Sequence, residues 1–143
     1  HGDKTQYAKS ITNIMTMSGR DIATDSDFII PVPIHLTRML KRKYNQASLI
    51  ANHLSKVYKK PVLYSTLIRS KSTPSQGHLS ERERKQNVSG VFSVKHSERI
   101  KGKNILLIDD VFTTGATVNE CAKILKKAGA NKVFVLTFAR AIK

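Results

Sequence analysis

Apolar side chains recur along this chain in two patterns, one typical of amphipathic helices and one typical of buried strands. Helical spacing over residues 3–20 predicts a helix that ends near Gly19. The apolar run 28–32, bounded by polar residues and prolines, predicts a short buried strand. A second amphipathic pattern over 44–57 predicts another helix, which Pro61 ends.

The second half of the chain continues this alternation. The pattern predicts strands over 62–68, 91–94, 104–108 and 131–138, and a helix over 114–128 that is closed by Gly129. Aliphatic strands that alternate with helices indicate a parallel sheet covered on both faces. No internal repeat or linker is visible, so we expect an α/β fold with one domain over residues 1–143.

Residues 69–90 break the alternation. Their only aliphatic side chains are Leu79 and Val88, among many polar and charged ones. We expect a long loop here, with a partly helical segment left open. Loops of this length are uncommon inside a compact domain and often act as lids over a site.

Composition limits the class of protein. One cysteine in 143 residues excludes a disulfide framework and a cysteine-rich zinc site. We expect this residue, Cys121, to be a buried structural thiol, and we find no partner for His53 or His96 at metal-ligand spacing. No apolar run approaches the ~20 residues that span a membrane, and the polar start is unlike a secretory signal. We therefore expect a cytoplasmic protein.

The net charge of +15 is concentrated in the middle of the sequence. Residues 35–103 hold 16 of the 25 Lys and Arg residues but only three acids, a net charge of +13. A basic segment of this kind favours partners such as nucleic acid, an anionic surface or phosphorylated small molecules.

Residues 105–117 carry the most specific chemistry. A buried strand leads into Asp109 and Asp110, and a turn rich in threonine, with Gly115 inside it, then opens a helix. In open α/β sheets, ligands bind beyond the carboxyl ends of strands, and a helix N-terminus attracts phosphate. The two acids can accept hydrogen bonds from sugar hydroxyls or hold hydrated Mg²⁺. The pattern predicts a ribose 5-phosphate site.

This stretch has two other interpretations. The acids and threonines could instead simply satisfy the backbone at the start of the helix. An NTPase phosphate loop is excluded, because Gly102 and Lys103 are followed by Asn104 and no glycine-rich loop precedes them.

The order of aliphatic run, two acids and Thr-Thr-Gly-Ala-Thr resembles the phosphoribosyl pyrophosphate signature of type I phosphoribosyltransferases. Upstream residues narrow the resemblance to the ComF family of bacterial competence-associated proteins. They are Pro31-Val32-Pro33-Ile34-His35, Arg38, Arg42, Tyr44-Asn45-Gln46-Ala47, Ile68-Arg69, Thr73, Gln76, Leu79, Arg84, Asn87 and Gly90-Val91-Phe92. The family's usual Arg-Gly-Phe is here Arg42-Lys43-Tyr44, and its usual N-terminal zinc ribbon is missing from this sequence.

The resemblance implies a Rossmann-like parallel sheet with helices on both faces and a flexible lid loop at 69–87. It also implies the following site residues: Asp109 and Asp110 for the ribose hydroxyls and, indirectly, Mg²⁺; Thr113, Thr114, Gly115, Ala116 and Thr117 for the 5-phosphate; and Ile34, His35, Arg82 and Arg84 for pyrophosphate, with Arg84 as the leaving-group ligand. The alternative for Arg82 and Arg84 is a solvated charge run balanced by Glu81 and Glu83. His78 is a candidate lid contact only because it lies within this loop. The catalytic set is thus Asp109, Asp110 and Arg84.

Two functions follow from the resemblance. One is Mg²⁺-dependent transfer of a phosphoribosyl group from phosphoribosyl pyrophosphate to an acceptor that the sequence does not identify. The other is a catalytically silent module that grips single-stranded DNA during uptake, with Arg38, Arg42, Lys43 and Tyr44 as contacts and with competence or recombination proteins as partners.

Overall fold

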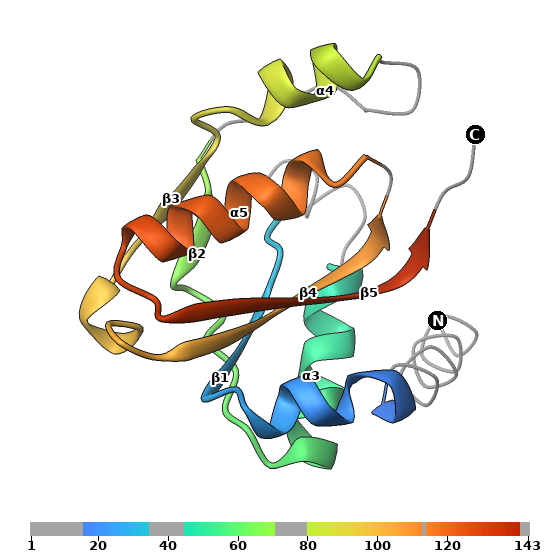
Figure 1. The fold of residues 1–143 in the computed structure, drawn as a ribbon, viewed down its shortest axis with the longest axis vertical. Helices are drawn as coiled ribbons and strands as arrows, with labels where there is room; N and C mark the ends of the chain where they lie inside the picture. The colour runs from blue at the N-terminus through green and yellow to red at the C-terminus, as the bar shows by residue number, and fades with distance from the viewer. Residues whose placement is uncertain (1–15, 35–44, 71–79, 113, 141–143) are drawn as a thin grey trace.

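A three-stranded parallel sheet forms the centre of the fold. The computed structural model describes residues 16–34, 45–70, 80–112 and 114–140. Within them, β4 (Asn104–Phe112) lies between β1 (Phe28–Pro31) and β5 (Lys132–Arg140) (Figure 1). Leu107 is in register with Ile30 on one side and Val135 on the other. The predicted parallel sheet is therefore confirmed.

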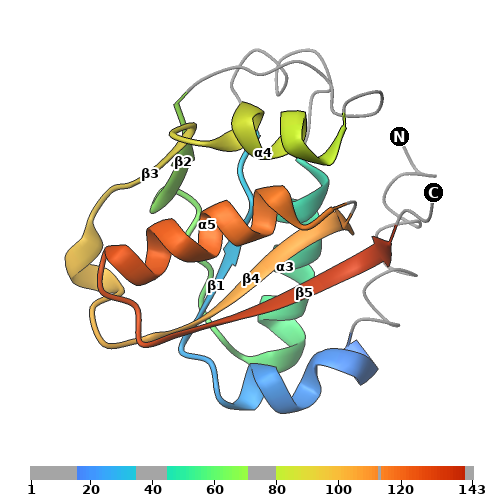
Figure 2. The ribbon, with the colours of Figure 1, turned by 45° about the horizontal axis from the view of Figure 1, so that its top comes forward.

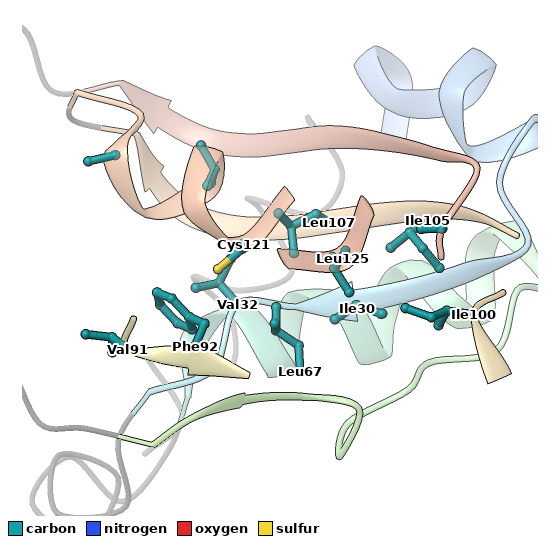
Figure 3. Close-up of a cluster of buried hydrophobic side chains, with 13 residues drawn as sticks. Ile30, Val32, Leu67, Val91, Phe92, Ile100, Ile105, Leu107, Cys121 and Leu125 are labelled. Carbon is teal, nitrogen blue, oxygen red and sulfur yellow. The ribbon is translucent and has the colours of Figure 1, made fainter. Parts of the chain in front are cut away.

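Each face of the sheet is covered by a helix because β4 is apolar on both sides. Ile105 and Leu107 point into a cluster with Cys121 of α5 (Ala116–Lys127) (Figure 3). The alternate residues Leu106 and Ile108 join a second cluster with α3 (Gln46–Tyr58). All four β4 side chains are fully buried, and burial of each contributes roughly 1.5–3 kcal/mol to stability.

The first described helix extends further than the sequence pattern predicts. It occupies residues 16–24 and passes through Gly19 instead of ending near it. A Cβ atom at Gly19 would lie 2.6 Å from Leu136 Cδ2, so the glycine allows the helix to approach β5. At the helix end, the Thr24 and Ser26 hydroxyls donate to the carbonyls of Arg20 and Ile22. Residues 3–15 of the prediction lie outside the described residues.

The predicted single strand over 62–68 is wrong. Residues 61–63 run beside β1, where Ile29 N donates to Pro61 O and Leu63 N donates to Ile29 O. After a bend at 64–66, β2 (Leu67–Arg69) pairs antiparallel with β3 (Phe92–Val94) in a separate sheet. Both strands are half-buried against the α5-side cluster, through Leu67 and Phe92 (Figure 3).

Part of the predicted loop is an ordered helix, α4 (Glu81–Val88). Ser80 begins it with a capping box, in which the Ser80 hydroxyl accepts from Glu83 N and the Glu83 carboxylate accepts from Ser80 N. The helix lies alongside α5 (Figure 2). The open alternative of a partial helix is therefore confirmed, whereas residues 71–79 lie outside the described residues.

Other boundaries agree with the sequence pattern or extend it. Gly129 follows α5 with a φ of +115°, a conformation that favours glycine at a helix end. β4 continues four residues beyond the predicted 104–108, through both acids. A single-turn helix, η1 (Ser97–Arg99), precedes it. In the described part of the chain, no helix is long and apolar enough to cross a membrane.

Candidate phosphoribosyl site

Asp109 and Asp110 lie within β4, immediately after its buried core. Asp109 is in register with Thr137 of β5. On the other side, Val32 N donates to the carbonyl of Ile108, 2.8 Å away, which fixes the end of β1 beside the acids. The two carboxylates are therefore held at the carboxyl end of the sheet, where ligands bind in open α/β folds.

The environment of the two acids disfavours a full double negative charge. Burial, and after it the neighbouring charge of Asp110, together raise the pKa of Asp109 from its ordinary 3.8 to about 7. The Asp109 carboxylate accepts a hydrogen bond from Asp110 N at 2.9 Å and also interacts with the Asp110 side chain. An incoming cation or a set of hydroxyl donors would stabilise the ionised pair.

The predicted phosphate turn begins α5. Gly115 is the N-cap residue, with a φ of +84° and no side-chain capping bond. The Thr114 hydroxyl accepts from Ala116 N at 3.3 Å, and the first α5 bond runs from Asn119 N to Gly115 O. The Thr114 hydroxyl thus satisfies one backbone N–H at the start of this helix, which agrees with the threonine part of the simpler interpretation. Thr114 and Thr117 are only partly buried, so they are accessible to a ligand.

Cys121 is fully buried in the cluster below this turn, among Val32, Leu107 and Phe92 (Figure 3). Burial raises the pKa of its thiol, and the negative charge of Asp109 raises it further. The expectation that Cys121 is buried is confirmed.

Arg69 is a site neighbour that the sequence reasoning left without a role. Its guanidinium lies 5.5 Å from the centre of the Phe92 ring, and its charge lowers the pKa of the Cys121 thiol. A cation from β2 is thereby placed near the α5 side of the sheet. The sequence alone hardly indicated this position of Arg69, because its contact with Phe92 depends on the pairing of β2 with β3.

The start of α3 reaches the same end of the sheet. Asn45 is its N-cap: the side-chain oxygen accepts from Ala47 N at 3.0 Å, and the side-chain nitrogen donates to Val32 O at 3.1 Å. The next residue, Gln46, has a buried side-chain nitrogen without a hydrogen-bond partner. An asparagine before a helical pattern is an N-cap signal that the sequence carried, but its bond to β1 was not predictable.

The structure places some predicted site residues and leaves others undescribed. Ile34 follows β1 and is partly buried, and Arg82 is exposed on α4. The interactions that shift the pKa of Asp109 come from burial and from Asp110, not from Arg82. The backbone of Arg84 lies in α4, but its side chain is outside the described set. The following also lie outside the described residues: His35, Arg38, Arg42, Lys43, Tyr44, His78 and Thr113.

The acids also suit a magnesium ion that keeps most of its water. Among the described residues, no group of three or more His, Cys, Asp or Glu side chains could enclose a metal. Mg²⁺ commonly binds through one or two carboxylates together with substrate phosphates, so the pair fits this cation if a phosphorylated ligand completes the shell. Asp109 and Asp110 would be its protein ligands, directly or through water.

Comparisons with known proteins agree with this geometry. A family model described as a phosphoribosyl transferase domain matches residues 44–142. The chain is 40% identical over 114 residues to competence protein F of Haemophilus influenzae, covering 79% of this chain and 50% of that protein. It is 33% identical over 116 residues to the DNA utilization protein YhgH of Escherichia coli K12, covering 81% and 50%. The chain therefore spans about half the length of these curated relatives.

Among solved structures, a purine phosphoribosyltransferase from Pyrococcus horikoshii superposes with a TM-score of 0.57. The match covers 92% of this chain and 71% of that one, at 17% sequence identity. At this identity the likeness establishes the fold alone, which is the predicted type I phosphoribosyltransferase fold.

Proposed function

Because the chain belongs to the phosphoribosyl transferase domain family, with the predicted resemblance to ComF proteins confirmed, we propose that it binds phosphoribosyl pyrophosphate and transfers its phosphoribosyl group. One observation carries the proposal. Two adjacent carboxylates follow the buried segment of a parallel strand, and Gly115, the N-cap of α5, comes five residues after Asp110. That arrangement combines a diol acceptor with a phosphate-binding helix terminus.

The 5-phosphate would bind at the start of α5. The helix N-terminus carries partial positive charge and backbone N–H groups, and Thr114 and Thr117 add hydroxyl donors. Gly115 has no side chain, so the phosphate could approach the backbone closely. Thr113 and Ala116 complete the predicted cradle.

The ribose would then lie over Asp109 and Asp110. A carboxylate oxygen accepts hydrogen bonds from hydroxyl groups, and two adjacent carboxylates match two vicinal hydroxyls. These hydrogen bonds would also favour the ionised form of Asp109, whose pKa is raised to about 7 without a ligand.

Transfer breaks the bond between C1 of the ribose and the pyrophosphate oxygen, and the electron pair leaves with the pyrophosphate. The ribosyl carbon gains positive charge as an acceptor nucleophile forms the new bond. The Asp109 and Asp110 carboxylates would hold the sugar and favour that charge, while Arg82 and Arg84 of α4 are the proposed cations for the leaving group. Bound Mg²⁺ would add positive charge beside the pyrophosphate. Ile34 and His35 would flank this group at the end of β1.

Calorimetric titration of phosphoribosyl pyrophosphate with Mg²⁺ tests the proposal. The wild-type chain should bind, and the double variant Asp109→Asn, Asp110→Asn should bind at least about 100-fold more weakly, because two hydrogen bonds to charged acceptors are lost. The control is Lys132→Ala, at the opposite end of the sheet, which should bind like wild type. Equal binding by the double variant would show that the site is elsewhere.

A second function, binding of single-stranded DNA in its uptake, is favoured by the opposite end of the sheet. Two segments, the one that precedes β4 and the one between α5 and β5, meet there through bonds from Gly102 N to Gly129 O and from Asn131 N to Lys103 O. They bring together these exposed cations: Arg99, Lys101, Lys103, Lys126, Lys127 and Lys132. The names of the relatives, a competence protein and a DNA utilization protein, point to the same process.

Fluorescence anisotropy with a labelled single-stranded oligonucleotide tests this second function. Affinity should fall steeply between ~50 and ~200 mM salt, because binding releases counterions from the phosphates. The triple variant Lys101→Glu, Lys103→Glu, Lys132→Glu should bind the oligonucleotide weakly and phosphoribosyl pyrophosphate normally. An affinity that is unaffected by salt would exclude the electrostatic mode.

A further inference from the structure

Gln46, the first residue of α3, carries a donor that the fold leaves unused. Its side-chain nitrogen is buried and has no hydrogen-bond partner. Only one other described side chain, Thr66, buries a polar atom in this way. A buried donor without an acceptor destabilises a fold, so such groups call for an explanation.

The position of Gln46 is fixed with respect to the proposed site. The preceding Asn45 donates to Val32 O, and Val32 N donates to Ile108 O. Ile108 directly precedes Asp109, so two hydrogen bonds connect the start of α3 with the acids of β4. Ile50 of α3 packs with Ile108 in one buried cluster, which holds the helix against the sheet.

The pleat of β4 indicates which acid shares a face with α3. Leu106 and Ile108 point toward α3, and period-two alternation puts Asp110 on that face. Asp109 lies on the α5 face, where its charge acts on Cys121. The start of α3, which carries Gln46, therefore lies on the face of the sheet opposite to α5.

We infer that Gln46 is a ligand-binding residue, whose side-chain amide donates to the pyrophosphate group of the bound sugar phosphate. The amide nitrogen can only donate, so it requires an acceptor, and phosphate oxygens are strong acceptors. Its place after β1 separates it from the 5-phosphate, which the start of α5 would hold. This inference rests on the proposed function.

The experiment compares Gln46→Met with wild type in two measurements, thermal unfolding and calorimetric binding of three probes. The probes are phosphoribosyl pyrophosphate, inorganic pyrophosphate and ribose 5-phosphate, each with Mg²⁺. The variant should unfold a few degrees higher, because it removes a buried unpaired donor. It should bind phosphoribosyl pyrophosphate and pyrophosphate about 10- to 100-fold more weakly and ribose 5-phosphate as wild type does.

Thr66→Val is the matched control, because Thr66 is fully buried with an unpartnered hydroxyl and precedes β2. It should gain stability and keep wild-type affinity for every probe. Gln46→Glu retains the shape of the side chain but presents negative charge to the anion, so it should bind pyrophosphate more weakly than Gln46→Met.

The possible results separate the two proposals. Wild-type binding with unchanged affinity in Gln46→Met overturns the role of Gln46 and leaves the proposed function intact. A loss for ribose 5-phosphate equal to that for pyrophosphate overturns the assignment of the group that Gln46 contacts. Destabilisation of Gln46→Met shows that the amide is paired within the protein and also overturns the inference. Absence of wild-type binding to phosphoribosyl pyrophosphate overturns both proposals.

Discussion

At the amino end of β4, polar groups form hydrogen bonds with other segments of the protein. At its carboxyl end, by contrast, the Asp109 carboxylate interacts with its neighbour Asp110. Asn104 N donates to the Asp27 carboxylate at 2.8 Å, and the Asn104 side chain donates to Asp25 O. Asn131 in turn donates to the Asn104 side chain at 2.9 Å. The hydrogen bonds described for the Asp109 carboxylate are with its neighbour Asp110.

The difference separates a structural end of the strand from a ligand-binding end. Acids whose partners lie in the chain stabilise the fold on their own. Acids whose charge is poorly compensated have a cost that a ligand or cation can remove. The same strand therefore supplies both, and the apolar residues 105–108 between them hold the two ends about 10 Å or more apart.

The largest expected effect is on the pH dependence of stability through Asp109. Between about pH 4 and pH 7 its carboxyl is ionised in the unfolded chain but holds a proton in the folded one, because the folded pKa is raised from 3.8 to about 7. The unfolded state then binds fewer protons, so the free energy of unfolding falls as pH rises through this window and levels off above it.

The substitution Asp109→Asn should remove this fall in the free energy of unfolding with rising pH. Chemical denaturation should find the variant about as stable as wild type near pH 4 and more stable at pH 8, by an amount on the order of a few kcal/mol. The difference between the two curves isolates Asp109 from every other titrating group. Curves that stay parallel from pH 4 to pH 8 would contradict the raised pKa.

The second expected effect concerns two glycines with similar positive φ angles, Gly102 before β4 and Gly115 after it. Gly115 has a φ of +84° and Gly102 a φ of +73°, and both conformations are strained for residues with a Cβ. Gly115→Ala and Gly102→Ala should each cost about 1–2 kcal/mol of stability. Only Gly115→Ala should also weaken binding of ribose 5-phosphate, by roughly tenfold or more, because it alters the start of α5.

Thermal unfolding and calorimetry on both variants measure these effects. Gly102 is a clean control, since a Cβ there meets no atom within 4 Å. Equal losses of affinity in the two variants would mean that binding responds to general stability and not to the geometry of the turn.

The central sheet and the two acids of β4 were predictable because the sequence patterns that indicate them lie within short segments of the chain. Residues 104–108 are continuously aliphatic, and the helix that follows them has a clear apolar face. The order of strand, acids, glycine turn and helix then specifies the carboxyl end of the sheet without any long-range information.

The second sheet and the second face of the site depend on long-range contacts. Residues 62–68 are apolar enough for one strand, but pairing with β3 places Leu67 and Ile68 in another sheet. Gln46 was part of the motif at 44–47, but its unpartnered amide was not predictable, because whether an amide is satisfied depends on partners elsewhere in the chain. The helix α4 was underestimated because its stability comes from a capping box and contact with α5 more than from apolar periodicity.

A smaller effect is expected at the paired end. Asp27→Ala removes the acceptor of the bond from Asn104 N, which is exposed enough for water to replace it. Stability should fall by about 1 kcal/mol, as measured by urea denaturation, and affinity for phosphoribosyl pyrophosphate should not change. A loss of affinity in this variant would mean that the two ends of β4 are coupled and not separate.

The smallest expected effect tests whether α4 belongs functionally to the carboxyl end. Ser80→Ala removes the capping box and should cost about 1 kcal/mol, confined to α4, so amide hydrogen exchange should accelerate there with little change in the midpoint of thermal unfolding. If the arginines of α4 contact pyrophosphate, affinity should fall severalfold, because the helix must reorder on binding. Arg82→Ala on an intact helix should then give a similar loss of affinity with unchanged exchange. Unchanged affinity in both variants would remove Arg82 from the proposed leaving-group ligands and leave α4 a structural partner of α5.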